Sequence, residues 1–133
     1  MLKTALIGYG YWGSKLARNF NNIKNFDLVS VIDLNKKNLS FAKKNYPLAK
    51  LYTDYKIAIN RDGIDFVIIS SPTSTHYQIA KFALESFKHV LVEKPLSLKL
   101  SEVKKLNQIA SKNKKMLFVD YPFLFSGAIN FIK

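Results

Sequence analysis

Three closely spaced glycines near the N-terminus are the first residues whose spacing suggests chemistry. Gly8, Gly10 and Gly13 fit the pattern G-x-G-x-x-G, between an apolar strand pattern and a helical pattern. In that context Gly8 permits a tight turn, Gly10 lets the backbone approach a pyrophosphate, and Gly13 lets the helix pack against the strand. The free amides at the start of the helix would bind the phosphates. Tyr11 and Trp12 lie inside this loop, and they either line the bound cofactor or pack over the domain edge.

An acidic residue follows at the distance that a ribose-binding carboxylate needs. Asp33 stands at the end of the second apolar run, twenty positions after Gly13. A carboxylate there accepts hydrogen bonds from both hydroxyls of an adenosine ribose and repels the 2′-phosphate of NADP. No arginine follows closely to hold that phosphate, so the sequence predicts NAD in preference to NADP. The alternative is that Asp33 only caps the helix that begins at Asn35.

Two further polar clusters follow the fourth and fifth apolar runs. They are Ser71-Pro72-Thr73-Ser74-Thr75-His76 and Glu93-Lys94-Pro95. Ligands of open parallel sheets bind at the carboxyl ends of the strands, where hydroxyl groups can contact ribose and phosphate. Lys94 could donate a proton to a substrate oxygen as a hydride moves. The alternatives are that the hydroxyls form an ordinary helix cap, that His76 is a surface residue, and that Lys94 is simply solvated.

The elements that would position these residues alternate along the chain. Short apolar runs predict strands at 2–7, 28–32, 51–52, 66–69, 90–92 and 116–119. Helical periodicity covers 11–20, 35–45, 75–87 and 101–111, and Asp54 is expected to cap a short helix through Ile59. Strands that are apolar on both faces and separated by amphipathic helices indicate a parallel sheet covered on both sides. We therefore expect an α/β fold with a doubly wound parallel sheet, the Rossmann fold.

The composition limits the other classes of function. The chain has 133 residues, no cysteine and two histidines, His76 and His89, which are too far apart to suggest a metal site. The formal net charge is +12, but all 21 basic residues except Arg18 and Arg61 are lysines spread along the chain. Lysines on solvated helix faces explain this charge better than nucleic-acid binding does. No apolar run is long enough to span a membrane and no signal peptide is evident, so we expect a cytoplasmic protein.

Taken together, these motifs resemble the N-terminal part of the Gfo/Idh/MocA oxidoreductases (glucose–fructose oxidoreductase, inositol dehydrogenase and their relatives). The glycine loop at 8–13, Asp33, the segment 71–76 and Glu93-Lys94-Pro95 occur in the order and spacing of that family. The similarity runs from about Leu2 to Val119. Ser71 replaces the threonine that often precedes the proline, which keeps a hydroxyl group.

The resemblance implies a role for each matching residue. Lys94 would be the catalytic lysine, which orients the substrate and transfers a proton at the reacting hydroxyl. Glu93 would contact the nicotinamide ribose side, while Ser71, Pro72 and His76 would line the cofactor. The Lys94–Pro95 peptide bond would be cis. The implied activity is NAD-dependent hydride transfer to or from a sugar, a polyol or a nucleotide sugar.

The same resemblance bears on domain organisation. We expect residues 1–120 to form an NAD-binding domain and residues 121–133 to begin the connection to a second, substrate-binding domain that is essentially absent here. The chain by itself would then be a poorly active enzyme. The alternative is a non-catalytic nucleotide-binding or sensing module that acts with a partner. The apolar tail at 121–133 is expected to be covered by a second copy of the chain, by a missing partner, or by both.

Overall fold

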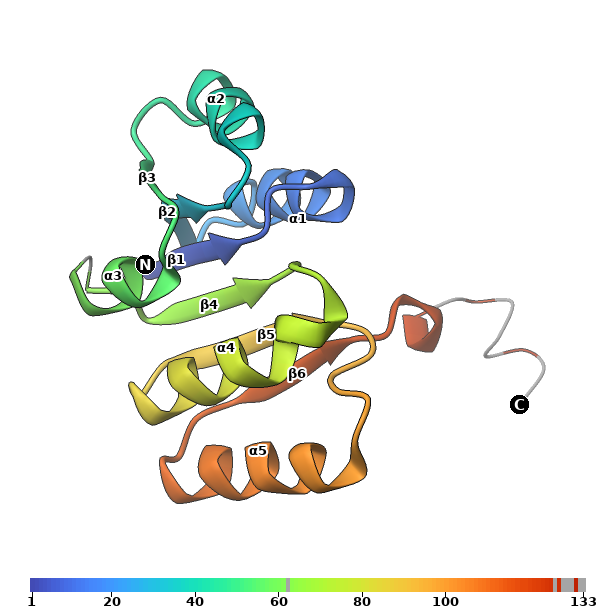
Figure 1. Cartoon of the computed structure of the whole chain (residues 1–133). Helices are drawn as coiled ribbons and strands as arrows, with labels where there is room; N and C mark the ends of the chain where they lie inside the picture. Colours follow the sequence, from blue (N-terminus) through green and yellow to red (C-terminus); the bar gives the residue numbers. More distant parts are fainter. Residues whose placement is uncertain (62, 126, 128–130, 132–133) are drawn as a thin grey trace.

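The computed structural model describes residues 1–61, 63–125, 127 and 131, and its centre is one parallel β-sheet (Figure 1). Six strands occur in the order β3-β2-β1-β4-β5-β6, and every neighbouring pair is parallel. The strands are β1 (Leu2–Ile7), β2 (Phe26–Ile32), β3 (Lys50–Tyr52), β4 (Phe66–Ile69), β5 (His89–Glu93) and β6 (Leu117–Asp120). The expected doubly wound parallel sheet is thereby confirmed.

Helices cover both faces of this sheet. They are α1 (Tyr11–Asn21), α2 (Lys36–Asn45), α3 (Tyr55–Arg61), α4 (Thr73–Glu85) and α5 (Leu100–Lys112), and a 3₁₀ turn, η1, spans Pro122–Phe125. Residues of α1 and α2 pack with Leu6, Ile68 and Leu91 in one core, and residues of α3, α4 and α5 pack with their strand neighbours in the other. Figure 1 shows α1 and α2 on the side of the sheet opposite α4 and α5. Alternate strand residues therefore face opposite cores, as the period of a strand requires.

The strand order creates the position at which a ligand can bind. From β1 the chain moves outward to β2 and β3, and it then returns through α3 to β4 on the other side of β1. The connections that leave the carboxyl ends of β1 and β4 therefore diverge to opposite faces of the sheet, which opens a crevice between them. The glycine loop and the Ser71–His76 segment follow these two strands.

Element boundaries differ from the predicted ones by a few residues. Helix α4 begins at Thr73 rather than at Thr75 and ends at Glu85, where the chain turns through Phe87 at a φ of 60°. Helix α3 extends to Arg61, and Asp54 accepts a hydrogen bond from the Lys56 amide at 2.8 Å, as the cap prediction required. The predicted cover over the tail at 121–133 concerns a segment that lies largely outside the described residues.

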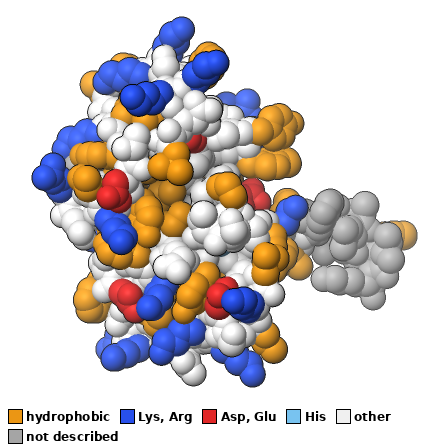
Figure 2. All heavy atoms as spheres, in the orientation of Figure 1, with side chains coloured by type: hydrophobic (Ala, Val, Ile, Leu, Met, Phe, Trp, Pro, Cys, Tyr) orange, Lys and Arg blue, Asp and Glu red, His pale blue; other side chains and the backbone are white. Residues whose placement is uncertain are grey.

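The distribution of basic side chains over the surface bears on the high net charge of the chain. On the face shown in Figure 2, the Lys and Arg side chains are spread over the molecule and alternate with hydrophobic and acidic side chains.

No helix within 1–61 and 63–125 is long and apolar enough to cross a membrane. Within the same ranges, no group of three or more His, Asp and Glu side chains could hold a metal ion.

The closest packing in the fold is the contact between α1 and the end of β1. A Cβ atom on Gly13 would lie 1.8 Å from the Gly8 carbonyl oxygen, far inside van der Waals contact. Gly8 itself has a φ of 92°, and a Cβ there would lie 2.5 Å from the Ser70 carbonyl oxygen. By contrast, a Cβ on Gly10 would have no heavy atom within 4 Å. Packing therefore requires a glycine at positions 8 and 13 of this loop, but not at position 10.

We predict that Gly13→Ala lowers the free energy of unfolding by at least about 1–3 kcal/mol, because α1 must move away from β1. Gly10→Ala is the matched control, and it should change stability by less than about 1 kcal/mol. Urea unfolding followed by circular dichroism measures both. Equal stability of the two variants would contradict the packing argument.

Candidate functional site

A cleft of about 1170 Å³ lies at the carboxyl edge of the sheet. This volume exceeds that of a typical small-molecule pocket, which holds roughly 300–1,000 Å³. Ten of the predicted site residues line it: Gly8, Gly10, Tyr11, Trp12, Asp33, Ser71, Pro72, His76, Glu93 and Lys94. Gly13 does not line the cleft, because it lies against the carbonyl of Gly8. The fold thus collects residues from the ends of four strands, β1, β2, β4 and β5, around one space.

The glycine loop forms one wall of the cleft. The Gly8 amide donates to the Ile32 carbonyl at 2.8 Å, which joins the loop to the end of β2. Helix α1 starts after Gly10, and no side chain caps it. The amides of its first turn therefore keep hydrogen-bonding capacity for an anion, and the helix dipole favours negative charge at this position.

Tyr11 and Trp12 are two aromatic residues that line the cleft. Both are largely exposed, and their rings meet edge to face with centroids 5.2 Å apart. The Lys15 ammonium lies 4.2 Å from the centre of the Tyr11 ring and donates to the Tyr11 hydroxyl at 2.8 Å. The two rings therefore present an aromatic edge at the mouth of the cleft.

Asp33 joins the glycine loop to the next helix. Its Oδ2 accepts from the Tyr9 amide at 2.7 Å and from the Asn38 side chain at 3.0 Å, and its Oδ1 accepts from the Asn35 amide at 2.7 Å. The N-cap of α2 is Asn35, whose own side chain accepts from the Lys37 amide. The alternative that Asp33 only caps this helix is therefore wrong. A carboxylate offers about four lone-pair positions, so at least one remains for a ligand hydroxyl.

Asn38 belongs to this site although the sequence analysis did not select it. It lines the cleft and holds one oxygen of Asp33 from the first turn of α2. The available signal was its position five residues after Asp33, where a first-turn side chain can reach back toward the end of the strand.

The loop after β4 carries a short chain of hydroxyl groups. Thr75 Oγ1 donates to the Pro72 carbonyl at 2.7 Å, and Ser71 Oγ lies 2.7 Å from Thr75 Oγ1. The residue at the N-cap of α4 is Pro72, and no side chain caps the helix. The expectation that one of these hydroxyls caps the helix is therefore wrong, because they bond to one another and to a carbonyl instead.

His76 is buried rather than on the surface. Only 1% of the residue is exposed, and its two ring nitrogens contact two carbonyl oxygens from different loops. Nε2 lies 2.8 Å from the Ser71 oxygen, and Nδ1 lies 2.9 Å from the Pro95 oxygen. The ring therefore bridges the loops that follow β4 and β5.

Glu93 and Lys94 stand at the end of β5, with Glu93 half-buried and Lys94 exposed. The Lys94 amide donates to Glu93 Oε2 at 3.2 Å, and the Lys94–Pro95 bond is cis, as the resemblance implied. Burial raises the pKa of Glu93 above its ordinary 4.5, and the negative charge of Asp120, its register partner on β6, raises it further. The Lys94 amide and the positive charges of Lys94 and His76 act in the opposite direction. Asp120 was not selected from the sequence.

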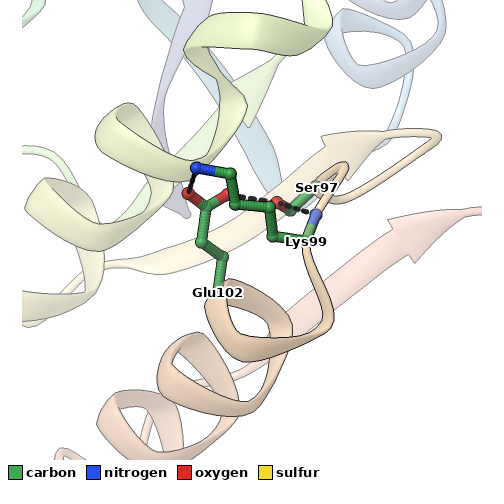
Figure 3. A network of polar contacts seen from close by, with 3 residues as sticks. All are labelled: Ser97, Lys99 and Glu102. Carbon is green, nitrogen blue, oxygen red and sulfur yellow. Dashed lines mark hydrogen bonds and ion pairs between the residues drawn. The ribbon is translucent and has the colours of Figure 1, made fainter.

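A second polar network fixes the chain just beyond Pro95 (Figure 3). Ser97 Oγ donates to the Glu102 carboxylate and accepts from the Lys99 amide at 3.1 Å. The Lys99 ammonium lies 3.9 Å from the other Glu102 oxygen, so Glu102 on the first turn of α5 holds the loop from two sides. The loop that carries Lys94 is therefore anchored where α5 begins.

The profile of the Gfo/Idh/MocA oxidoreductase family, described as an NAD-binding Rossmann fold, matches residues 2–121. The chain belongs to this family. The resemblance predicted from the glycine loop, Asp33 and the Glu-Lys-Pro segment is thus confirmed, and the chain is an NAD-binding Rossmann domain of the family.

Individual members of the family show how similar the chain is to known proteins. It is 29% identical over 120 residues to the myo-inositol 2-dehydrogenase of Thermotoga maritima, covering 90% of this chain and 36% of that protein. The crystal structure of the myo-inositol 2-dehydrogenase of Lactobacillus plantarum superposes with a TM-score of 0.90 at 27% identity. The match covers 98% of this chain and 39% of that chain. The biliverdin reductase of Synechocystis, solved with biliverdin and NADP⁺, superposes with a TM-score of 0.89 at 29% identity. That match covers 96% of this chain and 40% of the reductase chain. The chain spans about a third of the length of the curated family members that it matches.

The charge balance around Glu93 predicts a pH-dependent effect on stability. Because the pKa of Glu93 is raised above 4.5 in the folded chain, ionisation of this carboxyl disfavours the folded state as pH rises through that window. Glu93→Gln should therefore raise the unfolding midpoint at pH 7 by about 3 °C or less, and the gain should vanish below pH 4.5. Thermal unfolding at the two pH values measures this difference.

Glu85→Gln is the matched control, since Glu85 lies on the exposed end of α4 beside Lys81. Its replacement should change the midpoint little at either pH, because exposed ion pairs contribute little. A stabilising effect of Glu93→Gln that persists unchanged in acid would contradict the assignment.

Proposed function

We propose that the chain is the cofactor-binding part of an NAD-dependent dehydrogenase that acts on a polyol or sugar hydroxyl. The observation that carries the proposal is the single cleft that joins the glycine loop and Asp33 at one end to Glu93 and Lys94 at the other. In a bound dinucleotide, Asp33 would hold the adenosine ribose, the first amides of α1 would hold the pyrophosphate, and Lys94 would lie on the nicotinamide side. Two of the similar proteins named above are myo-inositol 2-dehydrogenases, which supports a polyol substrate.

Lys94 is the residue that we assign to proton transfer. Bound NAD⁺ supplies the hydride acceptor. The amine form of Lys94 takes the hydroxyl proton while the carbon–hydrogen bond of the same carbinol breaks and its C–O bond becomes a carbonyl. In the reverse direction the Lys94 ammonium returns the proton to the carbonyl oxygen. Among the described residues that line the cleft, Lys94 is the one Lys or Arg side chain, and both ring nitrogens of His76 already contact backbone carbonyls.

The remaining site residues are assigned to binding. Gly8 permits the tight turn after β1, Gly10 leaves room for the pyrophosphate, and Tyr11 and Trp12 flank it in the cleft. Ser71, Pro72 and His76 line the opposite wall, and Glu93 lies beside the nicotinamide ribose. Gly13 acts indirectly by allowing the close packing that positions α1.

Domain organisation follows from the same assignment. We propose that residues 1–120 are the NAD-binding domain and that residues 121–133 begin the connection to a substrate domain. That domain, or a second copy of the chain, would supply the other contacts to a sugar-type substrate. The alternative function is nucleotide sensing with a partner, and the two proposals differ in whether Lys94 is needed for anything beyond binding.

We predict that the chain binds NADH more tightly than NADPH, because the Asp33 carboxylate would repel a 2′-phosphate. Trp12 is the one tryptophan of the chain and lines the cleft, so energy transfer from its indole to the reduced nicotinamide reports binding directly. Asp33→Ala should weaken NADH binding by about 10- to 100-fold, as expected for hydrogen bonds to a charged group.

Asp27→Ala is the control for this experiment, since Asp27 lies on the same strand near its amino end and outside the cleft. It should leave the affinity for NADH unchanged. Equal affinities for NADH and NADPH, or an unchanged affinity in Asp33→Ala, would contradict the assignment.

We predict that any NAD reduction by the chain on a panel of polyols and sugars depends on Lys94. Lys94→Met should lower the rate by about 10²–10⁴-fold, the usual contribution of a general acid or base, and should keep NADH binding within a few-fold. The control Lys104→Met changes an exposed lysine of α5. Absorbance of NADH measures the rate. Turnover that survives Lys94→Met would contradict proton transfer by this residue, and binding without Lys94-dependent turnover would favour the sensing module.

A further inference from the structure

The two contacts of the His76 ring require a particular protonation state. The ring is 1% exposed, and its nitrogens lie 2.8 Å and 2.9 Å from the carbonyl oxygens of Ser71 and Pro95. A backbone carbonyl only accepts hydrogen bonds, whereas a neutral imidazole has one N–H group and one lone pair. In the neutral ring, one of these contacts would place a nitrogen lone pair against an oxygen lone pair. Both contacts are hydrogen bonds only in the imidazolium form.

We propose that His76 is a positioning residue that donates from both ring nitrogens and so clamps the loop after β4 to the loop after β5. The two carbonyls belong to the loops that follow the neighbouring strands β4 and β5, one next to Pro72 and the other next to Lys94. The clamp therefore holds these two loops at a fixed separation on the β4–β5 side of the cleft. Its loss of a proton releases one of the two carbonyls.

The surrounding charges show how a buried imidazolium is tolerated. Glu93 on β5 faces it, and the positive charge of His76 acts to lower the pKa of that carboxyl. Asp120 on β6 adds negative charge beyond Glu93, whereas Lys94 opposes the imidazolium and the N-terminal end of α4 carries a positive dipole. The β4–α4 loop contributes the hydroxyls of Ser71 and Thr75 but no charged side chain. The carboxylate of Glu93 and the two carbonyl dipoles are thus the groups that favour the proton.

The clamp acts on Lys94 through its neighbours. Glu93 pairs in the ladder with β6 on one side of Lys94, and the Pro95 oxygen is bound by His76 on the other. Further along, the Ser97–Glu102 bond holds the loop to α5 (Figure 3). The backbone of Lys94 thus lies between anchored points, while its side chain stays free to move a proton. Release of the Pro95 carbonyl removes the nearest anchor.

The protonation state is tested by nitrogen NMR on the whole chain labelled with ¹⁵N-histidine. The chain has two histidines, and His89 is a built-in reference because its Nδ1 accepts from the Met116 amide at 3.1 Å and is therefore unprotonated. At neutral pH we expect His76 to show two protonated ring nitrogens and His89 to show one of each kind. His89→Gln assigns the signals. One unprotonated nitrogen on His76 at neutral pH would overturn the clamp.

The positioning role is tested by the pH dependence of NADH binding, a step that rests on the proposed function. Wild-type affinity should fall as rising pH removes the His76 proton, in parallel with its NMR titration. In His76→Gln both N–H donors are on one amide nitrogen, which cannot take the place of both ring nitrogens, so one carbonyl loses its partner. The affinity should therefore be weaker, by about tenfold for one lost hydrogen bond, and flat over that range. Lys104→Met, which changes an exposed lysine of α5 outside the cleft, is the control and should retain the wild-type pH dependence.

The possible failures of the two proposals are distinct. A pH dependence of NADH binding that is the same in His76→Gln and the wild type would overturn the positioning role. A wild-type chain that binds no NADH would contradict the proposed function, while the NMR spectrum would still decide the protonation state of His76. If His76→Gln does not fold, the comparison of the NMR titration with wild-type affinity decides the coupling.

Discussion

The close contact between Gly13 and the Gly8 carbonyl is the constraint on which the site depends. It allows α1 to start directly against the end of β1, with no side chain separating the helix from the strand. The first turn of α1 therefore points its amides into the crevice between β1 and β4 rather than across the surface. A larger residue at either position would move the helix and change the shape of the whole cleft.

The two walls of the cleft are held by different means. On the β1–β2 side, Asp33 uses a charged acceptor to bind the amide of Tyr9 and the first turn of α2. On the β4–β5 side, His76 binds two backbone carbonyls. Hydrogen bonds to a charged group, such as the Asp33 carboxylate, are stronger than those between neutral groups. The groups that shape the cleft are thus the same groups whose charge a nucleotide would meet.

The net charge of the whole chain differs from the charge of the side chains that line the cleft. The chain carries a net charge of +12, yet the described lining of the cleft holds Lys94 together with the carboxylates of Asp33, Asp54 and Glu93. The basic side chains seen in Figure 2 lie around the molecule rather than in one patch. An overall positive charge of this kind affects solubility and association, and it does not describe the local charge of the cleft.

By itself, the sequence determined the alternation of strands and helices, the doubly wound sheet, and the placement of the glycine loop, Asp33 and Lys94 at one edge. These properties follow from local periodicity, turn residues and the rule that parallel strands end at a common edge, so neighbours in the chain carry the information. Only the tertiary structure decided that Asp33 binds Tyr9 and Asn38, that the hydroxyls of Ser71 and Thr75 bond to each other, and that His76 is buried between two carbonyls. Tyr9 lies 24 residues from Asp33 and Pro95 lies 19 residues from His76, and these pairs meet because β2 lies beside β1 and β5 lies beside β4. Which strands become neighbours is a result of packing in the whole sheet, and no local pattern specifies it.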